Sequence, residues 1–322
     1  MGGSLIVSLD FELFWGMLDK CSLEEYQDHV LGGREAIPQM LALFEKYHIH
    51  ATWAAVGFLF AENEQELRGY FPEQRPTYAN EKLDPYAEFA KIGANEQEAP
   101  CFYAPSLLRL ISESPGQEIG SHTFSHYYCR AKGQTPEQFA ADMKAAKAIA
   151  GAHGYELTSV VLPRNQCEIA YTRVLREAGF TAYRDEENDW IHEKIKFFPL
   201  LRLLRLVDAY FPLTGQSGYR PRCEEGIWNL TGSRMYRPIR KSLKFLEGLK
   251  MRRIKRQMLY AAKNGLTYHL WWHPHNVGVR TQEHMAQLED IFRYYTELKE
   301  TYGMQSLNMR EAAEKQKAEE KA

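Results

Sequence analysis

Two histidines stand four residues apart at the end of the stretch GQEIGSHTFSH, at His122 and His126. If this segment makes one helical turn, both imidazoles lie on the same face and can bind one metal ion. A chain of 322 residues with 11 histidines contains such a pair by chance often enough that the pair alone is a weak signal. A metal site is therefore predicted only if the chain supplies further ligands near these two.

Other ionisable residues follow other predicted strands. Asp10 and Glu12 come at the end of the apolar run that begins at Ser4, and residues two apart in an extended segment point to the same side. Two histidines with one carboxylate, and a position left for water, are typical of a catalytic zinc site rather than a closed structural one. The remaining candidates at strand ends are Arg164, Asp189 with Trp190, and His273.

Each of these residues also has an ordinary structural explanation. An acid at the end of a strand is often a turn former or a helix cap, and Asp189 lies in the charged stretch RDEENDW, where most acids are solvated. Arg164 could form a surface ion pair, and His273 could be a core histidine. Their occurrence together, in one order along the chain, favours a functional site.

Short apolar strands alternate with helices through most of the chain. One predicted helix begins near Thr135, where Thr135, Pro136 and Gln138 form a capping signature. This alternation predicts βα units around a parallel sheet, in a barrel or an open doubly wound form, and both forms gather functional groups at the C-terminal ends of the strands. The predicted strands include residues 4–9, 50–58, 158–163, 180–184 and 266–274, and the predicted helices include residues 33–49, 168–179 and 281–300.

The composition is that of a soluble globular protein, with 44% hydrophobic and 25% charged residues. The 40 Lys and Arg residues nearly balance the 42 Asp and Glu residues, which argues against a general nucleic-acid binder. Five cysteines without a Cys-x-x-Cys pair indicate reduced thiols. The first residues lack a basic region and a small-residue cleavage site, and no stretch is long and apolar enough to span a bilayer. We therefore expect a cytoplasmic protein.

The order of these motifs is similar to that of the polysaccharide deacetylases, the NodB-homology family of carbohydrate esterases. The resemblance covers Ser4 to about Glu300 and depends on the motifs SLDFE, HTFSH, Asp189-Trp190 and LWWHP. It implies an α/β fold, a distorted (β/α) barrel of this family's type with a helical insertion. It also implies a metal-dependent hydrolase that acts on carbon–nitrogen bonds other than peptide bonds.

The resemblance assigns a metal site and a pair of proton-transfer residues. Glu12, His122 and His126 would hold one divalent ion, with zinc as the default. The family commonly has two adjacent aspartates in its first motif, whereas this chain reads Asp-Phe-Glu. Asp10 would be the general base, and His273 in LWWHP would be the general acid.

The same resemblance assigns supporting residues. The third motif commonly reads Arg-x-Pro-aromatic-Gly, whereas this chain reads LPRNQ, so Arg164 would orient the base from a shifted position. Asp189 would orient and charge the general acid. The predicted substrate contacts are Trp190, Trp272 and Pro163, with a backbone N–H after Pro163 near the developing oxyanion.

We predict a single catalytic barrel over residues 1–307, followed by a polar C-terminal tail at residues 308–322 that has no core to join. The barrel includes a helical and basic insertion at residues 191–264. The first part of this insertion is strongly apolar, and residues 237–256 carry nine Lys and Arg against one Glu. An apolar segment beside a basic one is typical of a protein that rests on an anionic membrane surface, or alternatively of a lid that folds onto the barrel.

The predicted reaction removes N-acetyl groups from an amino sugar, in a polysaccharide or in a lipid-linked or nucleotide-linked precursor of a cell-surface polysaccharide. Asp10 would deprotonate the metal-bound water as it attacks the acetamide carbonyl, and His273 would protonate the departing amine. Two alternatives stay open. One is an amidohydrolase that cleaves the C–N bonds of a small non-sugar amide, and the other is a catalytically silent member that binds glycan.

Overall fold

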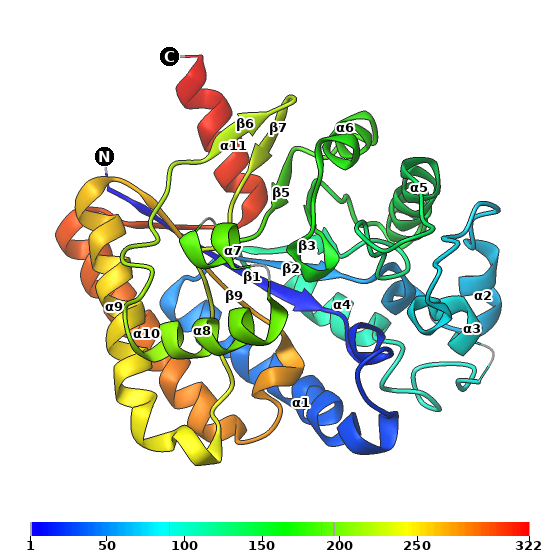
Figure 1. Ribbon diagram of the computed structural model, residues 1–322, viewed down its shortest axis with the longest axis horizontal. Coiled ribbons are helices and arrows are strands. Elements are labelled where there is room, and N and C mark those ends of the chain that lie inside the picture. The colour runs from blue at the N-terminus through cyan, green and yellow to red at the C-terminus, as the bar shows by residue number, and fades with distance from the viewer. Residues whose placement is uncertain (1, 90, 188, 196, 322) are drawn as a thin grey trace.

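The parallel sheet at the centre of the molecule runs through strand β1 (Ser4–Phe11), which lies between β2 (Ala51–Ala55) and β9 (Thr267–Trp272). The computed structural model describes residues 2–89, 91–187, 189–195 and 197–321. Beyond β2 the parallel order continues with β3 (Gln117–Ser121), β4 (Ser159–Val161) and β5 (Ala182–Arg184). Helices surround these strands in Figure 1. The predicted α/β fold with a mainly parallel sheet is confirmed.

Helices connect successive strands and cover the outside of the sheet. The crossover from β1 to β2 runs through α1 (Leu23–Tyr47), which begins at a capping box formed by Ser22 and Glu25. The predicted cap at Thr135 begins α5 (Pro136–Ala152), since the Thr135 hydroxyl accepts a hydrogen bond from the N–H of Gln138. Among the described residues, none of the helices combines the length and the apolar composition that crossing a bilayer requires. The other helices that follow the strands are α2 (Glu64–Gly69), α3 (Pro85–Phe89), α4 (Pro105–Glu113), α6 (Ile169–Glu177) and α10 (Thr281–Tyr302).

One short segment closes the sheet into a barrel. Its first part, β7 (Ile227–Asn229), pairs in parallel with β5, and its last part, β8 (Arg234–Met235), pairs in parallel with β9. Between the two, the Gly232 N–H donates to the Asp185 carbonyl and the Ser233 N–H donates to the His269 carbonyl. This segment therefore joins both edges of the sheet and gives a distorted barrel. Strand β6 (Arg222–Glu224) adds an antiparallel hairpin outside β7.

The stretch predicted as an insertion, residues 191–264, is thus only partly an addition to the barrel. Helices α7 (Trp190–Lys194) and α8 (Phe198–Tyr210) stand outside the strands, whereas β7 and β8 belong to the barrel wall. Helix α9 (Glu247–Asn264) buries one face, including Ile254 and Met258, in the main core. The closing strand was not predicted because its apolar run is short and is interrupted by polar residues and a glycine.

Side chains of β1 alternate between the outer shell and the barrel interior. Leu5, Val7 and Leu9 pack in the core that the surrounding helices share. Ile6 belongs to a separate interior cluster, and Asp10 further along the same face meets Arg184 of β5. Strand geometry alone explains this separation, because successive side chains point to opposite faces. The C-terminal half of the inner face is therefore where ionisable groups converge.

Helix α11 (Met309–Glu320) covers the opposite end of the barrel, and the expectation of a tail with no core to join is wrong. The helix begins at a capping box formed by Asn308 and Glu311, just after β10 (Gln305–Leu307) pairs with the start of β1. Its small apolar residues were too few to predict a packed helix within such a polar stretch. They nevertheless fit the narrow interior, where Met309, Ala312 and Ala313 pack with Ile6, Ala54, Val161, Ala182, Trp228 and Leu230.

We expect Met309→Ala to lower the free energy of unfolding by about 2 to 4 kcal/mol, because it opens a cavity in this interior cluster. The matched control is Glu314→Ala on the exposed side of the same helix, which should change that free energy by no more than about 0.5 kcal/mol. Denaturant unfolding followed by circular dichroism measures both. Equal, small effects of the two substitutions would mean that α11 does not contribute to the core.

Candidate metal centre and active site

Strand alternation places two carboxylates at the C-terminal end of β1. Asp10 and Glu12 are both buried on the inner side, whereas Phe11 between them points into the shell and packs edge-on against Trp53. Glu12 lies against the backbone of Gly16, where a Cβ atom would come within 2.1 Å of its carboxylate. Any larger residue at position 16 would therefore displace the Glu12 carboxylate. The predicted shared direction of Asp10 and Glu12 agrees with this geometry.

The loop after β3 carries His122 and His126, and it is an irregular turn rather than a turn of helix. Thr123 and His126 adopt left-handed backbone conformations, with φ of 65° and 56°. The Thr123 hydroxyl accepts a hydrogen bond of 2.7 Å from the N–H of Tyr127, which spans the turn. The two imidazoles are brought together by this folded loop and not by helical spacing.

Asp142 of α5, which was not predicted from the sequence, fixes the middle of that loop. Its buried carboxylate accepts hydrogen bonds from the N–H of Phe124 at 2.7 Å and of Ser125 at 3.2 Å, and it also contacts the Ser125 hydroxyl. Burial raises the pKa of Asp142 to about 7. An acid on the otherwise Ala-rich side of the helix after HTFSH was the available signal.

Glu12, His122 and His126 form a group whose ligand atoms all lie within 4.8 Å of one another. The Glu12 Oε2 atom is 3.2 Å from His122 Nε2 and 2.9 Å from His126 Nε2. Burial lowers the pKa of His126 to about 4 despite its hydrogen bond to Glu12, so this imidazole is neutral. Burial alone would raise the pKa of Glu12, but His273 and the hydrogen bonds from both histidines hold it well below its usual value. An ionised carboxylate beside neutral imidazole is the state that a divalent ion requires, so these residues fit one.

Asp10 is held by a buried ion pair with Arg184, the last residue of β5. The Arg184 guanidinium donates to Asp10 Oδ2 at 2.7 Å and to the Ser8 hydroxyl at 2.7 Å. Burial raises the pKa of Asp10, but Arg184, with His273 and His122, outweighs burial and lowers the pKa below its ordinary value. Its other oxygen, Oδ1, is buried and has no hydrogen-bond partner among the described residues. That oxygen is free to accept a proton.

The expectation that Arg164 orients Asp10 is corrected by this geometry. Arg164 donates instead to Asp19 at 2.6 Å, and its guanidinium lies 4.3 Å from the ring centre of Tyr128. Its neighbour Asn165 points inward and accepts from Arg184 at 2.9 Å. The reason is local, because Arg164 and Asn165 both have left-handed backbone conformations in the turn after β4. The predicted strand at residues 180–184 ends in Arg184, so strand-end position was the signal that could have found it.

His273 follows β9 and completes the group. Its Nε2 atom lies 3.6 Å from Asp10 Oδ2 and 3.6 Å from Glu12 Oε1. The His273 side chain is 20% exposed, whereas those of Asp10 and Glu12 are 5% and 3% exposed, so His273 faces the opening of the site. Burial lowers its pKa, and the two carboxylates oppose that shift.

The partner of His273 Nδ1 is the Asn276 side chain, at 3.2 Å. Asp189 had been expected to orient this histidine, but its carboxylate accepts the N–H of Ile191 at 2.9 Å and so caps α7. Asn276 lies only three residues after His273, in the turn that follows the strand. Asn276 was not predicted because an asparagine in a turn has an ordinary structural explanation.

The predicted substrate contacts have different surroundings. Trp272 is fully buried and packs edge-on against Phe44 and Tyr236 on the outer side of β9, which contradicts its assignment as a substrate contact. Trp271 is the tryptophan that lies beside Arg184, with the guanidinium 4.3 Å from its ring. Pro163 is buried at the start of the turn after β4. Trp190 is 40% exposed, as expected for a residue that can contact a ligand.

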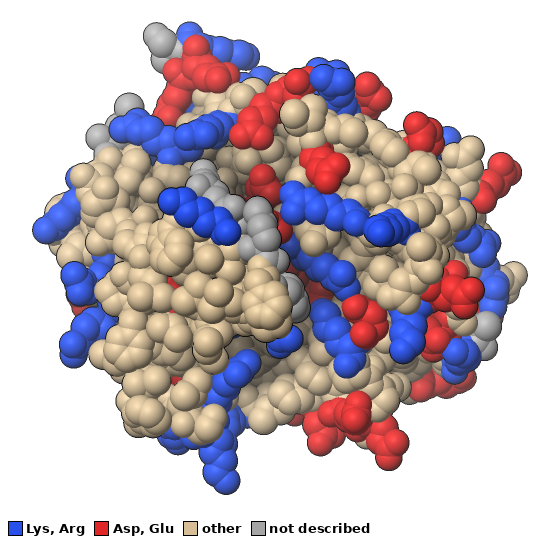
Figure 2. All heavy atoms as spheres, in the orientation of Figure 1, with Lys and Arg blue, Asp and Glu red and all other residues tan. Residues whose placement is uncertain are grey.

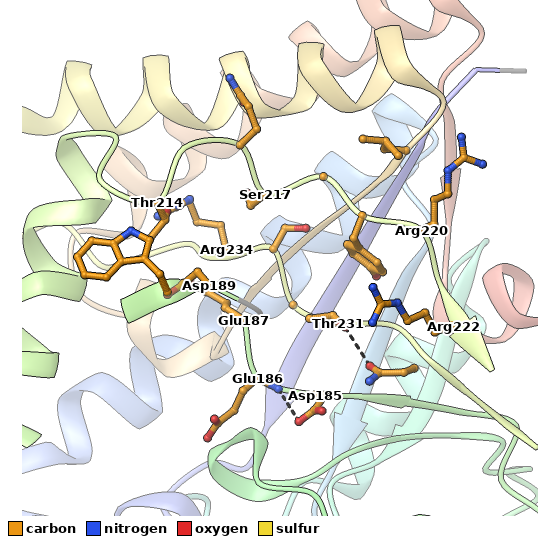
Figure 3. Close-up of a pocket in the computed structure, with 18 of the residues that line it drawn as sticks. Asp185, Glu186, Glu187, Asp189, Thr214, Ser217, Arg220, Arg222, Thr231 and Arg234 are labelled. Atoms are coloured by element: carbon orange, nitrogen blue, oxygen red, sulfur yellow. Dashed lines mark hydrogen bonds between the residues drawn. The ribbon is translucent and has the colours of Figure 1, made fainter. Parts of the chain in front are cut away.

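A polar cavity of about 890 Å³ begins one residue beyond Arg184, at Asp185. Figure 3 shows acids of the loop after β5 on one side and Arg220 and Arg222 on the other. The Ser217 and Tyr219 hydroxyls in its lining are buried and have no hydrogen-bond partner among the described residues. The lining therefore offers both hydrogen-bond donors and acceptors, together with the indole of Trp190.

The fold and the site together define a class of protein: a distorted α/β barrel with a candidate metal centre of one carboxylate and two histidines at the C-terminal ends of its strands. Residues 26–183 match the family model described as polysaccharide deacetylase. The chain therefore contains a domain of the polysaccharide deacetylase family over these residues, as its motifs predicted. His122 and His126 lie inside the matched range, whereas Asp10, Glu12 and His273 lie outside it.

Solved structures support the fold over nearly the whole chain. A protein from Mycobacterium smegmatis assigned to the polysaccharide deacetylases is 13% identical, with a TM-score of 0.62, and the match covers 99% of this chain and 92% of that one. A Pseudomonas aeruginosa protein of the same assignment is 13% identical, with a TM-score of 0.53 and coverage of 97% and 89%. PuuE allantoinase is 11% identical, with a TM-score of 0.56 and coverage of 97% and 88%. No curated protein matches the sequence.

We expect the purified protein to bind about one equivalent of a divalent ion and His126→Ala to lose it, because two ligands cannot replace the set of three. Plasma mass spectrometry after reconstitution with zinc measures the metal content. The control is His153→Ala, which removes a histidine that pairs with Glu66 on another surface and should leave the content unchanged. A His126→Ala variant that is folded and still holds the ion would place the metal elsewhere.

Proposed function

We propose that the protein is a metal-dependent hydrolase that removes N-acetyl groups from an amino sugar, in a polysaccharide or in its carrier-linked precursor. The observation that supports this proposal is that a candidate metal group, a candidate base and a candidate acid lie together at the C-terminal ends of the strands. His273 lies 3.6 Å from the candidate base, Asp10, and 3.6 Å from Glu12 of the candidate metal group. Hydrolysis of an amide needs an activated water, a base and an acid, and these residues can supply each.

Glu12, His122 and His126 would hold the divalent ion. Such an ion lowers the pKa of a bound water and polarises a carbonyl oxygen. The chain's own contribution is to keep the three ligands buried and close together, with Glu12 ionised and His126 neutral before the ion binds. Gly16, which leaves room for the Glu12 carboxylate, and Asp142, which holds the histidine loop, both support this role.

Asp10 and His273 would handle the protons. As the water oxygen bonds to the acetamide carbon, Asp10 accepts the proton through its unpaired Oδ1, and Arg184 on Oδ2 keeps the carboxylate ionised. His273 then donates a proton to the amine nitrogen as the carbon–nitrogen bond breaks. The products are acetate and a free amino group on the sugar, so atoms and charge balance without any further reactant.

The sugar part of the proposal rests on the family and on the polar cavity that begins at Asp185, next to Arg184. An acetylated sugar is the substrate class that the polysaccharide deacetylase family implies. The cavity lining, with hydroxyls, acids, arginines and the exposed indole of Trp190, suits a ligand that carries many hydroxyl groups and an apolar ring face. Attachment of that sugar to a lipid or nucleotide carrier is the part of the proposal that needs its own substrate test.

We expect Asp10→Asn and His273→Gln each to lower the rate of acetate release from N-acetylglucosamine oligomers by roughly 10²- to 10⁴-fold, because each removes one proton transfer. Metal content should stay at the parent level in His273→Gln, which separates acid catalysis from metal loss. The control is His153→Gln, distant from the site. Full activity in both Asp10→Asn and His273→Gln would refute the assigned roles.

The same assay distinguishes the alternative functions. Acetate release from acetylated oligosaccharides, with no cleavage of small cyclic amides, is the expected result. Cleavage of the cyclic amides alone would identify an amidohydrolase of another substrate class. Binding of the oligomers by a metal-loaded parent that releases no acetate from free or carrier-linked sugars would identify a catalytically silent glycan binder.

Substitution of Arg184 should lower kcat, whereas substitution of Arg164 should not. We expect Arg184→Lys to lower kcat by about 10- to 100-fold, because lysine keeps the charge but loses the fixed fork that contacts Asp10, Ser8 and Asn165 together. The matched variant Arg164→Lys alters a partly exposed pair with Asp19 and should leave kcat nearly unchanged. The opposite order of effects would return the orienting role to Arg164.

A further inference from the structure

We propose that the protein rests on the surface of an anionic lipid bilayer through one face of α8 and its surroundings. This face, called here the α8 face, consists of six exposed large hydrophobic residues, Phe197, Leu200, Leu203, Phe211, Leu213 and Phe245, and it adjoins Trp190, which lines the cavity. The proposal concerns a docking surface and does not depend on the reaction. Its support comes from exposure, packing and charge.

Apolar exposure is concentrated on this face. Of the eleven large hydrophobic residues that are exposed among the described residues, seven lie between positions 190 and 245. Phe197 is 68% exposed and Phe245 is 80% exposed, so both rings project into solvent. Single exposed hydrophobic residues need no explanation, but a contiguous group of large ones marks an interaction site.

Helix α8 explains why these residues share one direction. Phe197, just before the helix, and Leu200, Leu203 and Phe211 recur at spacings close to the helical repeat. The last turn of the helix packs inward, where Ala209 and Tyr210 are buried and Asp208 pairs with Arg234 and Arg253 at 3.0 and 2.8 Å. The Trp190 indole donates to the Leu213 carbonyl at 3.1 Å, which joins the residues on either side of α8 into one surface. A helix that exposes several large apolar side chains on its surface is expected to contact a partner there.

The exposed charge along α8 and along residues 237–246 is positive. Within residues 194–211 and 237–246 the only acid is Asp208, and it is buried in the ion pairs described above. Figure 2 shows an extensive surface without charge over the region of α8, bordered by Lys and Arg, while Asp and Glu gather elsewhere on the view. The exposed cations of these two segments are Lys194, Arg202, Arg240, Lys241 and Lys244, of which Lys244 pairs with Glu283 of α10 at 2.7 Å.

Apolar side chains inside a border of cations match a bilayer with anionic headgroups. The rings and leucines can enter the boundary between headgroups and acyl chains, while Lys and Arg remain at the level of the phosphates. A second copy of this chain fits less well, because its own basic border would face the first one. We therefore assign this surface to anionic lipid.

Vesicle flotation of the full chain tests the proposal directly. The protein should float with vesicles of phosphatidylcholine mixed with phosphatidylglycerol, float weakly with phosphatidylcholine alone, and release as the salt concentration rises. Phe197→Ser/Leu203→Ser should weaken partitioning by roughly tenfold or more, because it removes the apolar insertion. Arg240→Gln/Lys241→Gln should weaken it by about fivefold for each charge removed.

Matched controls separate this face from general surface properties. Ile169→Ser removes an exposed hydrophobic residue from α6, and Lys82→Gln/Lys132→Gln removes two exposed cations near the loops after β2 and β3. Both should float like the parent. A parent that stays at the bottom with anionic vesicles, or α8-face variants that float as well as the parent, would overturn the proposal. So would a parent dimer that the α8-face variants dissociate while lipid binding is absent, since the surface would then serve self-association.

Discussion

The arrangement of the C-terminal ends of the strands depends on the buried ion pair between Arg184 and Asp10. The Arg184 guanidinium makes the other contacts that hold these ends together. Its side chain is fully inaccessible, so its charge is stable there only because Asp10 compensates it and other groups take its remaining N–H donors. Ser8 of β1 and Asn165 in the turn after β4 accept these N–H groups, and the guanidinium lies 4.3 Å from the ring of Trp271 in β9. Removing one partner of such a buried pair costs about 3 to 5 kcal/mol. The ends of strands on opposite sides of the barrel are thereby held in one geometry.

A second hydrogen-bond network, through His269 and Ser8, reaches the Arg184–Asp10 ion pair. His269 donates through Nδ1 to the Leu230 carbonyl at 2.9 Å, and its Nε2 lies 2.7 Å from the Ser8 hydroxyl. Burial lowers the pKa of His269 to about 3, so the ring is neutral and its Nε2 accepts from Ser8, leaving the Ser8 oxygen to accept from Arg184. Together with Asp142 behind the histidine loop, this network leaves the polar groups around the candidate centre little freedom to reorient. A site held in this way needs little rearrangement when a ligand binds.

Much of this architecture could be predicted from the sequence because the signals are local. The run at β1, the cap at Thr135 and the HTFSH motif each report on a few neighbouring residues, and the strand alternation that aims Asp10 and Glu12 inward follows from the same short range. What could not be predicted depends on the backbone conformation of irregular turns or on contacts between distant segments. Arg184 rather than Arg164 meets Asp10 because two residues turn left-handed after β4, and Asn276 rather than Asp189 meets His273 because of one turn after β9. The closing strand and α11 were missed because their apolar residues are few and gain meaning only inside a barrel.

Because α11 forms the floor of the barrel, the interior is enclosed only after the chain beyond residue 308 has been synthesised. A nascent chain that already contains every residue of the candidate centre still exposes the apolar interior, including Ile6, Ala54 and Val161. Such an intermediate presents apolar surface to chaperones and proteases during the interval before α11 is synthesised. Loss of a short C-terminal piece, far in space from the chemistry, would therefore leave all the reactive groups in place on a chain that quality control treats as unfinished.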